Sequence, residues 1–216
     1  MYRDLSHPIE TGIQTFPGDP AVSVEPVATA EADGYRVSEI RCGSHTGTHV
    51  DAPSHVGLEG SIDAFGPDRF VFDARVVDCP GRDPRESIGP SALPDDDDGE
   101  MVVIRTGWDE HWGTPRYLDH PYLSSGAADR CVEAVWSVGL DTLNPDPTPS
   151  GNSTPAEPEG FPAHHRLLGN DLFVVENLRN LAGLGRCRLF AVPLPIAGGD
   201  GSPVRAFAVD RSSPGQ

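Results

Sequence analysis

Residues 44–55, Ser-His-Thr-Gly-Thr-His-Val-Asp-Ala-Pro-Ser-His, form the most informative segment of this chain. Three of the eight histidines and one aspartate fall within eleven positions there: His45, His49, Asp51 and His55. Neutral imidazole and carboxylate are ligands that zinc and manganese accept. Gly47 and Pro53 favour a bent, irregular segment, because glycine opens unusual dihedrals and proline removes a backbone donor. A polar loop with surface histidines is the alternative, but the clustering around one aspartate predicts a metal site.

Apolar runs on both sides of this segment are typical of β-strands. The expected strands are Val22 to Val27, Val37 to Cys42, Arg69 to Cys79, Met101 to Arg105, Leu172 to Glu176, Arg186 to Leu194 and Val204 to Val209. The clearest helix is Ser124 to Val138, because apolar residues recur there at helical offsets. Ser124 or Ser125 can cap its start, and Gly139 is expected to end it. Strands therefore dominate, with two or three helices.

Two segments between these elements are expected to be loops. Residues 145–162 are rich in Pro, Ser and Gly, and a long loop in a compact domain is often a lid or a family-specific insertion. Asp95 to Asp98 is an acidic run that lacks the spaced ligands of an EF-hand calcium site. We expect it to be a solvated loop.

The 216 residues suit one domain spanning 1–216, since no composition shift divides the chain. The formal charge is −17, and all sixteen basic residues are arginine. This pattern resembles adaptation to a salt-rich cytoplasm, as in halophilic archaea, although a GC-rich genome would also favour arginine. The acidic balance makes nucleic acid an unfavourable partner.

The N-terminus lacks the apolar stretch of a signal peptide, and no run is long enough to span a membrane. The four cysteines lie far apart: Cys42, Cys79, Cys131 and Cys187. They are expected to be small core residues in a reducing compartment rather than a disulfide framework. We therefore expect a soluble, cytoplasmic protein without a membrane partner.

A buried metal needs further ligands from distant sequence. His164 and His165 begin a short helical stretch, and Glu176 ends the apolar run that starts at Leu172. A carboxylate at the end of a buried strand is costly unless it is paired or bound to metal. Alternatively, His164 and His165 are an ordinary pair at the start of a helix and Glu176 is a strand-end residue at the surface, since carboxylates are mostly exposed. The residues alone do not decide between these two interpretations.

At this point the chain resembles the cyclase family of metal-dependent hydrolases, which includes bacterial kynurenine formamidase. The resemblance runs nearly end to end. Its motifs are Phe16-Pro17-Gly18-Asp19-Pro20, residues 44–55 as H-x-G-T-H-x-D-x-P-x-H, Gly139-Leu140-Asp141-Thr142, His164 with Glu176 and Asn177, and Leu194 to Arg205. The histidine motif is specific, whereas the others are individually weak but occur in the expected order.

The resemblance implies an α/β fold: a single domain with a β-rich, partly open barrel-like core and helices packed outside, of the swivelling β/β/α type. It also implies two divalent ions, zinc or manganese, in each subunit. His45, His49 and Asp51 would serve one ion, and Asp51 would bridge to a second ion held by His164 and Glu176. The adjacent His165 leaves open which histidine of that pair binds metal, and the twelve-residue offset from Glu176 favours His164.

The same resemblance assigns proton transfer to His55 and contact with the substrate's aryl group to Phe16. Kynurenine formamidases of this family usually carry Trp where Phe16 stands, and this difference bears on the substrate rather than on the reaction class. The implied activity is arylformamidase, converting N-formylkynurenine to kynurenine and formate in a homodimer or larger homo-oligomer. Hydrolysis of a cyclic amide, imide or lactone, as in isatin hydrolase, is an alternative.

Other function classes lack their motifs. The chain contains no G-x-S-x-G, HExxH, P-loop or G-x-G-x-x-G sequence, which argues against serine hydrolase, zincin protease, NTPase and dinucleotide-binding enzymes. A structural metal site in a non-catalytic oligomer is a further alternative. Such sites favour cysteine ligands and leave no open position, whereas this cluster consists of histidine and carboxylate.

Overall fold

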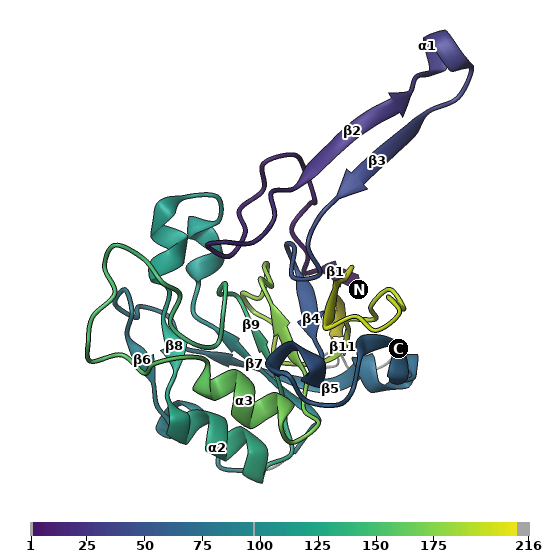
Figure 1. Cartoon of the computed structure of the whole chain (residues 1–216). Coiled ribbons are helices and arrows are strands. Elements are labelled where there is room, and N and C mark those ends of the chain that lie inside the picture. The colour runs from purple at the N-terminus through teal and green to yellow at the C-terminus, as the bar shows by residue number, and fades with distance from the viewer. Residues whose placement is uncertain (1, 97, 211–216) are drawn as a thin grey trace.

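The structure, a computed structural model, describes residues 2–96 and 98–210. Within them, nine strands form one mixed sheet in the order β1-β13-β11-β5-β7-β9-β10-β4-β12. Their bounds are β1 Tyr2–Asp4, β4 His49–Asp51, β5 Val71–Asp78, β7 Met101–Arg105, β9 Ser137–Leu140, β10 Val174–Glu176, β11 Arg186–Phe190, β12 Gly201–Pro203 and β13 Phe207–Asp210. The sheet curls into a half-barrel within a single α/β domain, as predicted (Figure 1).

Helices and two small sheets complete the fold. The α-helices are α1 Ala30–Asp33, α2 Ser125–Glu133 and α3 Pro162–Leu168. Six 3-10 helices span Pro53–Val56, Ile62–Ala64, Pro67–Phe70, Pro90–Ala92, Trp108–His111 and Pro115–Asp119. Strand β2 Ser23–Ala28 pairs with β3 Val37–Arg41, and β6 Ser87–Ile88 pairs with β8 Tyr122–Leu123. In Figure 1 the β2–β3 hairpin, with α1 at its tip, extends away from the rest of the molecule.

Apolar side chains are buried on both faces of the central sheet. In β7, Met101 and Val103 belong to one buried cluster, and Val102 and Ile104 belong to another. The second cluster includes residues of α2 and α3, which pack together over that face (Figure 1). A central strand between parallel neighbours is buried on both sides, which explains its continuous apolar sequence.

The helix expected over Ser124 to Val138 is shorter than the sequence suggested. It starts as predicted, with Ser124 Oγ accepting from Ala127 N–H, but it ends at Glu133. Val135 then takes a left-handed backbone conformation with φ 58°, and Ser137–Leu140 forms strand β9. Gly139 lies inside that strand rather than ending the helix. A Cβ there would lie only 3.0 Å from Leu178 Cδ1, so a larger residue would require the Leu178 side chain to shift.

Other sequence predictions have clear outcomes. Each expected strand overlaps an observed one, although β2 ends at Ala28 and β13 spans Phe207–Asp210. Strands β1, β4, β6, β8, β9 and β12 were not foreseen as separate strands. Cys79, Cys131 and Cys187 are buried, but Cys42 is exposed at the end of the β2–β3 hairpin, so its assignment to the core was wrong. Asp95, Asp96 and Asp98 are exposed as expected, and Asp97 lies outside the described residues. No helix in the described residues is long and apolar enough to span a membrane.

Candidate active site

Strands β4 and β10 place three of the candidate residues side by side. They pair antiparallel, with His49 opposite Glu176 and Val50 opposite Val175. Side chains alternate between the faces of a strand. Val50 and Val175 enter the hydrophobic core, so His49, Asp51 and Glu176 project from the opposite face. All three are buried.

The peptide at Gly47 orients the His49 ring. Gly47 has φ 61°, a left-handed conformation that glycine adopts without strain. Its carbonyl oxygen lies 2.8 Å from His49 Nδ1, and the Asn177 Nδ2 amide also donates to it at 2.9 Å. His49 Nε2 therefore faces the carboxylates, 3.3 Å from Asp51 Oδ1 and 3.2 Å from Glu176 Oε2.

Helix α3 brings His164 to the same carboxylates. Its Nδ1 lies 2.9 Å from Asp146 Oδ2, and its Nε2 lies 3.2 Å from Glu176 Oε1 and 3.4 Å from Asp51 Oδ2. Asp146 also accepts the backbone N–H groups of Ala163 and His164 in the first turn of α3. One buried carboxylate thus caps the helix and fixes the ring that the helix carries.

These residues fit a metal centre. His45, His49 and Asp51 form one group whose ligand atoms all lie within 4.8 Å of one another, and Asp51, His164 and Glu176 form a second. Within the described residues, His49 Nε2, Asp51 Oδ2 and Glu176 Oε1 are buried atoms without a hydrogen-bond partner. Buried polar atoms ordinarily have partners, and a divalent cation would satisfy all three.

The electrostatics agree with cation binding. Burial alone would lower the pKa of His49, but Asp51 and Glu176 outweigh it and raise that pKa to about 10. The same balance, with Asp146 contributing, raises the pKa of His164 well above its ordinary value. Burial opposes the ionised form of Asp51, yet the neighbouring imidazoles hold its pKa well below the usual value. A metal ion would replace these imidazole protons as the positive partner of the carboxylates.

His45 and His55 lie nearer the opening of the site. His45 Nδ1 is 2.8 Å from Asp51 Oδ1, and its Nε2 is 3.1 Å from Asp200 Oδ2. The ring centroids of His45 and His55 are 4.0 Å apart, and His55 Nδ1 is 3.6 Å from Asp200 Oδ2. Burial lowers the pKa of His55, which favours a neutral ring near pH 7. His45, His55 and Asp200 form a third group with metal-ligand spacing.

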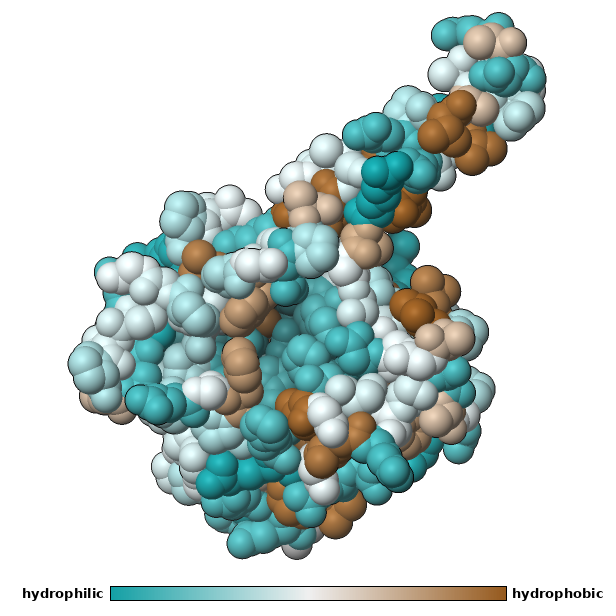
Figure 2. All heavy atoms as spheres, in the orientation of Figure 1, coloured by the Kyte–Doolittle hydropathy of each residue, from teal (hydrophilic) through white to brown (hydrophobic). Residues whose placement is uncertain are grey.

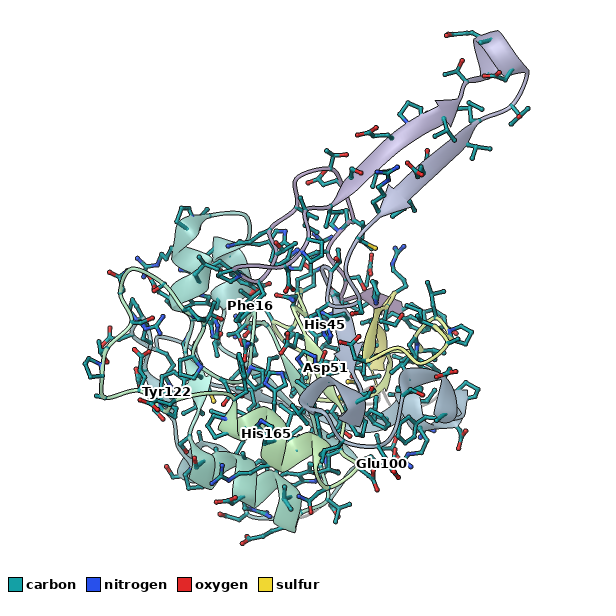
Figure 3. All side chains as sticks on the ribbon, in the orientation of Figure 1. Phe16, His45, Asp51, Glu100, Tyr122 and His165 are labelled. Carbon is teal, nitrogen blue, oxygen red and sulfur yellow. The ribbon has the colours of Figure 1, made fainter. Side chains whose placement is uncertain are left out.

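A cavity of about 310 Å³ opens above these residues. It is lined by Phe16, Asp19, His45, His49, His55, Val56, Leu143, Asn144, Phe161, His164, His165 and Glu176. Figure 2 shows the hollow at the centre of this face, near the root of the hairpin, and Figure 3 shows Phe16, His45, Asp51 and His165 around it. The ring centroids of Phe16 and Phe161 are 6.1 Å apart, and both rings line one side of the cavity. His165 is exposed at the rim, whereas His164 is buried at the floor.

Comparison with known proteins identifies the family. The sequence profile of the family named Cyclase matches residues 3–147. This chain belongs to the cyclase family. A kynurenine formamidase from Salinibacter ruber is 34% identical over 98% of both chains. Another, from a strain of Bacillus cereus, is 31% identical over 94% of both.

Solved structures agree with this cyclase-family assignment. An isatin hydrolase bound to the product analogue thioisatinate superposes with a TM-score of 0.81 at 25% identity, covering 97% of this chain and 92% of that one. Together with the kynurenine formamidase relatives, this similarity supports a hydrolase of the cyclase family.

The structure of this cyclase-family chain adds two residues that the sequence did not single out. Asp200 lies in the Gly-Gly-Asp-Gly sequence, whose glycines were the available signal of a close backbone approach. A Cβ on Gly201 would lie only 2.8 Å from the His45 ring. Asp146 is the second residue of the Pro-, Ser- and Gly-rich loop expected over 145–162, and no local pattern marked it. The loop expected over 145–162 is free of strand and helix as far as Phe161, but its first residues are buried.

Proposed function

We propose that this protein is a metal-dependent hydrolase of small amides, with N-formylkynurenine as the leading substrate and kynurenine and formate as products. The observation that carries the proposal is the buried set of His49, Asp51, His164 and Glu176 at the floor of an open cavity, in which three polar atoms have no hydrogen-bond partner among the described residues. The kynurenine formamidase relatives, which cover almost the whole chain, support the substrate.

The donor set suits two divalent ions, zinc or manganese, that share Asp51. His45 and His49 would complete one site, and His164 and Glu176 the other. When bound, such ions polarise a carbonyl and lower the pKa of water toward neutrality. The site opens to a cavity, and the side chain of His55 there is 32% exposed. A purely structural metal site would be closed and richer in cysteine, so this geometry favours catalysis.

Residues of the chain account for the remaining chemistry. A neutral His55 at the cavity side of the cluster can hold and pass a proton, and the leaving amine nitrogen of an amide must receive one. Phe16 and Phe161 can stack on the aryl ring and exclude water from that side. Asp200, within reach of both His45 and His55, can hold these rings in place.

A second candidate is a neutral cyclic amide or lactone. N-formylkynurenine carries an ammonium and a carboxylate group. Among the described residues, the cavity lining offers Asp19 to the ammonium but contains no arginine or lysine for the carboxylate. A neutral cyclic substrate does not need a cationic residue in the cavity. The superposition on an isatin hydrolase also supports this second candidate.

A substrate panel tests the proposal. Protein loaded with zinc or manganese in molar KCl would be assayed against N-formylkynurenine, formanilide, isatin and a simple lactone. Formate release from the first two supports arylformamidase activity, and ring opening alone supports the second candidate. Absence of turnover with all four, in protein that holds metal, contradicts both.

The cellular setting is part of the proposal. A charge of −17 without lysine favours a salt-rich cytoplasm, because salt screens the repulsion among the carboxylates. We expect activity and thermal stability to increase on transfer from low salt to molar KCl. We also propose that the substrate is a small molecule and that the chain assembles into a homo-oligomer.

A further inference from the structure

A second cavity lies apart from the proposed active site. Its volume is about 480 Å³, and its lining residues come from β1, β12 and the segments that follow β1, β10 and β11. Among the described residues, none lines both this cavity and the cavity above the metal ligands. Cavities of this size commonly hold small molecules.

Two residues that line the second cavity each bury a nitrogen atom that has no hydrogen-bond partner among the described residues. The atoms are Nε2 of His7 and Nε of Arg179. His7 is 7% exposed, and its ring stacks on Trp112 with the two centroids 4.0 Å apart. Buried polar atoms ordinarily have partners, so two such atoms beside one cavity point to a ligand.

The charge of Arg179 has no carboxylate partner within the part of the chain that the structure describes. Asp4 lies on the same cavity, but both of its carboxylate oxygens accept from Arg205, at 2.9 and 2.7 Å. The chain has 33 acidic residues and 16 arginines, so an unpaired arginine is not a consequence of too few carboxylates. Two arginines and one aspartate give this cavity a net positive charge.

His7 can add a neutral hydrogen-bond donor to this charge. Burial and the charge of Arg179 lower the pKa of His7 to about 4, so the ring is neutral near pH 7 and carries one N–H. A neutral imidazole adopts the tautomer that its partners require, and an acceptor in the cavity would place the proton on Nε2. An anion is such an acceptor, and it would also pair with Arg179.

The rest of the cavity wall is largely apolar. Pro8, Ile9, Leu194 and Val204 line it, and Ile9 and Leu194 are 38% and 63% exposed. An inorganic anion would leave these side chains in water, whereas an anion with an apolar body would cover them. Apolar walls with a few directed polar groups are typical of small-molecule sites.

The second cavity also adjoins the residues that support the metal centre. Thr48, which lines it, accepts from the His7 backbone N–H at 3.0 Å and directly precedes His49. Thr48 Oγ1 donates to the Asn177 carbonyl at 2.6 Å, and the Asn177 side chain donates to the Gly47 carbonyl beside the His49 ring. A ligand in this cavity can therefore reach the support of His49 without contacting the metal.

We propose that the second cavity binds a small organic carboxylate. The carboxylate group accepts from Arg179 and His7, and the apolar part of the ligand lies on Ile9 and Leu194. Arginine favours carboxylates because its planar donors match their two oxygens. Calorimetric titration of the metal-loaded, full-length chain tests the site with benzoate, its neutral analogue benzamide, and acetate, at one fixed ionic strength. Benzoate should bind saturably. Benzamide lacks the charge and acetate lacks the apolar body, so each should bind at least tenfold more weakly.

Variants of the lining residues test the assigned contacts. Arg179→Gln should weaken benzoate binding at least tenfold, because a hydrogen bond to a charged group contributes about that much. If Arg179→Gln does not fold, Arg179→Lys retains the charge without Nε and should weaken binding at least threefold. His7→Phe keeps a ring on Trp112 but removes the donor, and a similar loss is expected. Arg3→Gln is the matched control. Arg3 donates to two backbone carbonyls and does not line the cavity, so benzoate affinity should stay within about twofold of wild type.

Carboxylates also bind metal ions, so binding at the metal centre must be distinguished from binding in the second cavity. His49→Ala, which should lose metal, should still bind benzoate in the second cavity. Benzoate binding that is lost in His49→Ala and unchanged in Arg179→Gln belongs to the metal centre and overturns the inference. The absence of saturable binding, equal affinities for benzoate and benzamide, or equal affinities for benzoate and acetate would also overturn it.

Discussion

Replacing Asp146 by asparagine should weaken metal binding although Asp146 itself is not among the proposed ligands. Asp146 accepts from Ala163 N at 2.8 Å, from His164 N at 3.0 Å and lies 2.9 Å from His164 Nδ1. An asparagine keeps one acceptor oxygen and presents an NH2 group to the remaining donors, so His164 loses the contact that aims Nε2 at Glu176. Loss of such a supporting contact typically weakens metal affinity 10–100-fold, which corresponds to about 1.4–2.8 kcal/mol.

The assay is competition for zinc between the protein and a chelator of known affinity. The matched control is Asp129→Asn. Asp129 lies in α2, and its Oδ1 is 2.7 Å from Nε of Arg166, which lies in α3, the helix that carries His164. That pair is solvent-exposed and should contribute little, so zinc affinity in the control should stay within about twofold of wild type. Zinc affinity of Asp146→Asn equal to that of the control would refute the role given to Asp146.

Further substitutions probe the other parts of the site and the core. His55→Ala should retain metal but lose amide hydrolysis by about 10²–10⁴-fold, with a smaller loss for activated esters, whereas His49→Ala should lose metal first; metal analysis beside amide and ester kinetics distinguishes the two. Gly201→Ala should displace the His45 ring, because the new Cβ would lie 2.8 Å from it, and reduce metal occupancy. Burial lowers the pKa of His120 to about 4, so the folded state holds this ring neutral. Because that pKa is below the unfolded value of 6.5, the stability involved is present above pH 6.5 and is lost as pH falls toward 4. Wild type should therefore lose about 3 kcal/mol more unfolding free energy than His120→Asn between pH 7 and pH 4, measured by denaturant titration of both proteins. A difference between the two proteins that does not change with pH contradicts the assignment.

Local sequence patterns predict much of the first half of the site. The clustering of histidines around Asp51 predicts the metal ligands, but it was expected to lie in a bent, irregular segment, whereas His49–Asp51 is strand β4. The apolar Val50 between His49 and Asp51 was the available signal for that strand. The apolar run before Glu176 likewise predicts a buried strand with a carboxylate at its end. The pairing of His49 with Glu176 depends on strand order, which no short segment encodes.

The features that were missed depend on contacts between distant residues. Helix α3 is capped by Asp146, far upstream of Ala163, so a search for a capping residue next to the helix finds only Phe161. The early end of α2 depends on Val135 in a left-handed conformation, which β-branched residues rarely adopt. Alternation of buried Trp136, Val138 and Leu140 was the available signal for strand β9.

The exposure of the β2–β3 hairpin also lies beyond local patterns. Alternating residues predict β2 and β3 correctly, but the same alternation would suit a strand packed on the core. Only the tertiary structure shows that Ile40 faces solvent.

The most direct test of the central claim is formate release from N-formylkynurenine or formanilide as zinc or manganese is titrated into metal-free protein. We predict that activity rises in proportion to bound metal, saturates at two ions per chain and is absent from His49→Ala at the same metal concentrations. Full activity in metal-free protein, or activity of His49→Ala equal to wild type, would contradict the account.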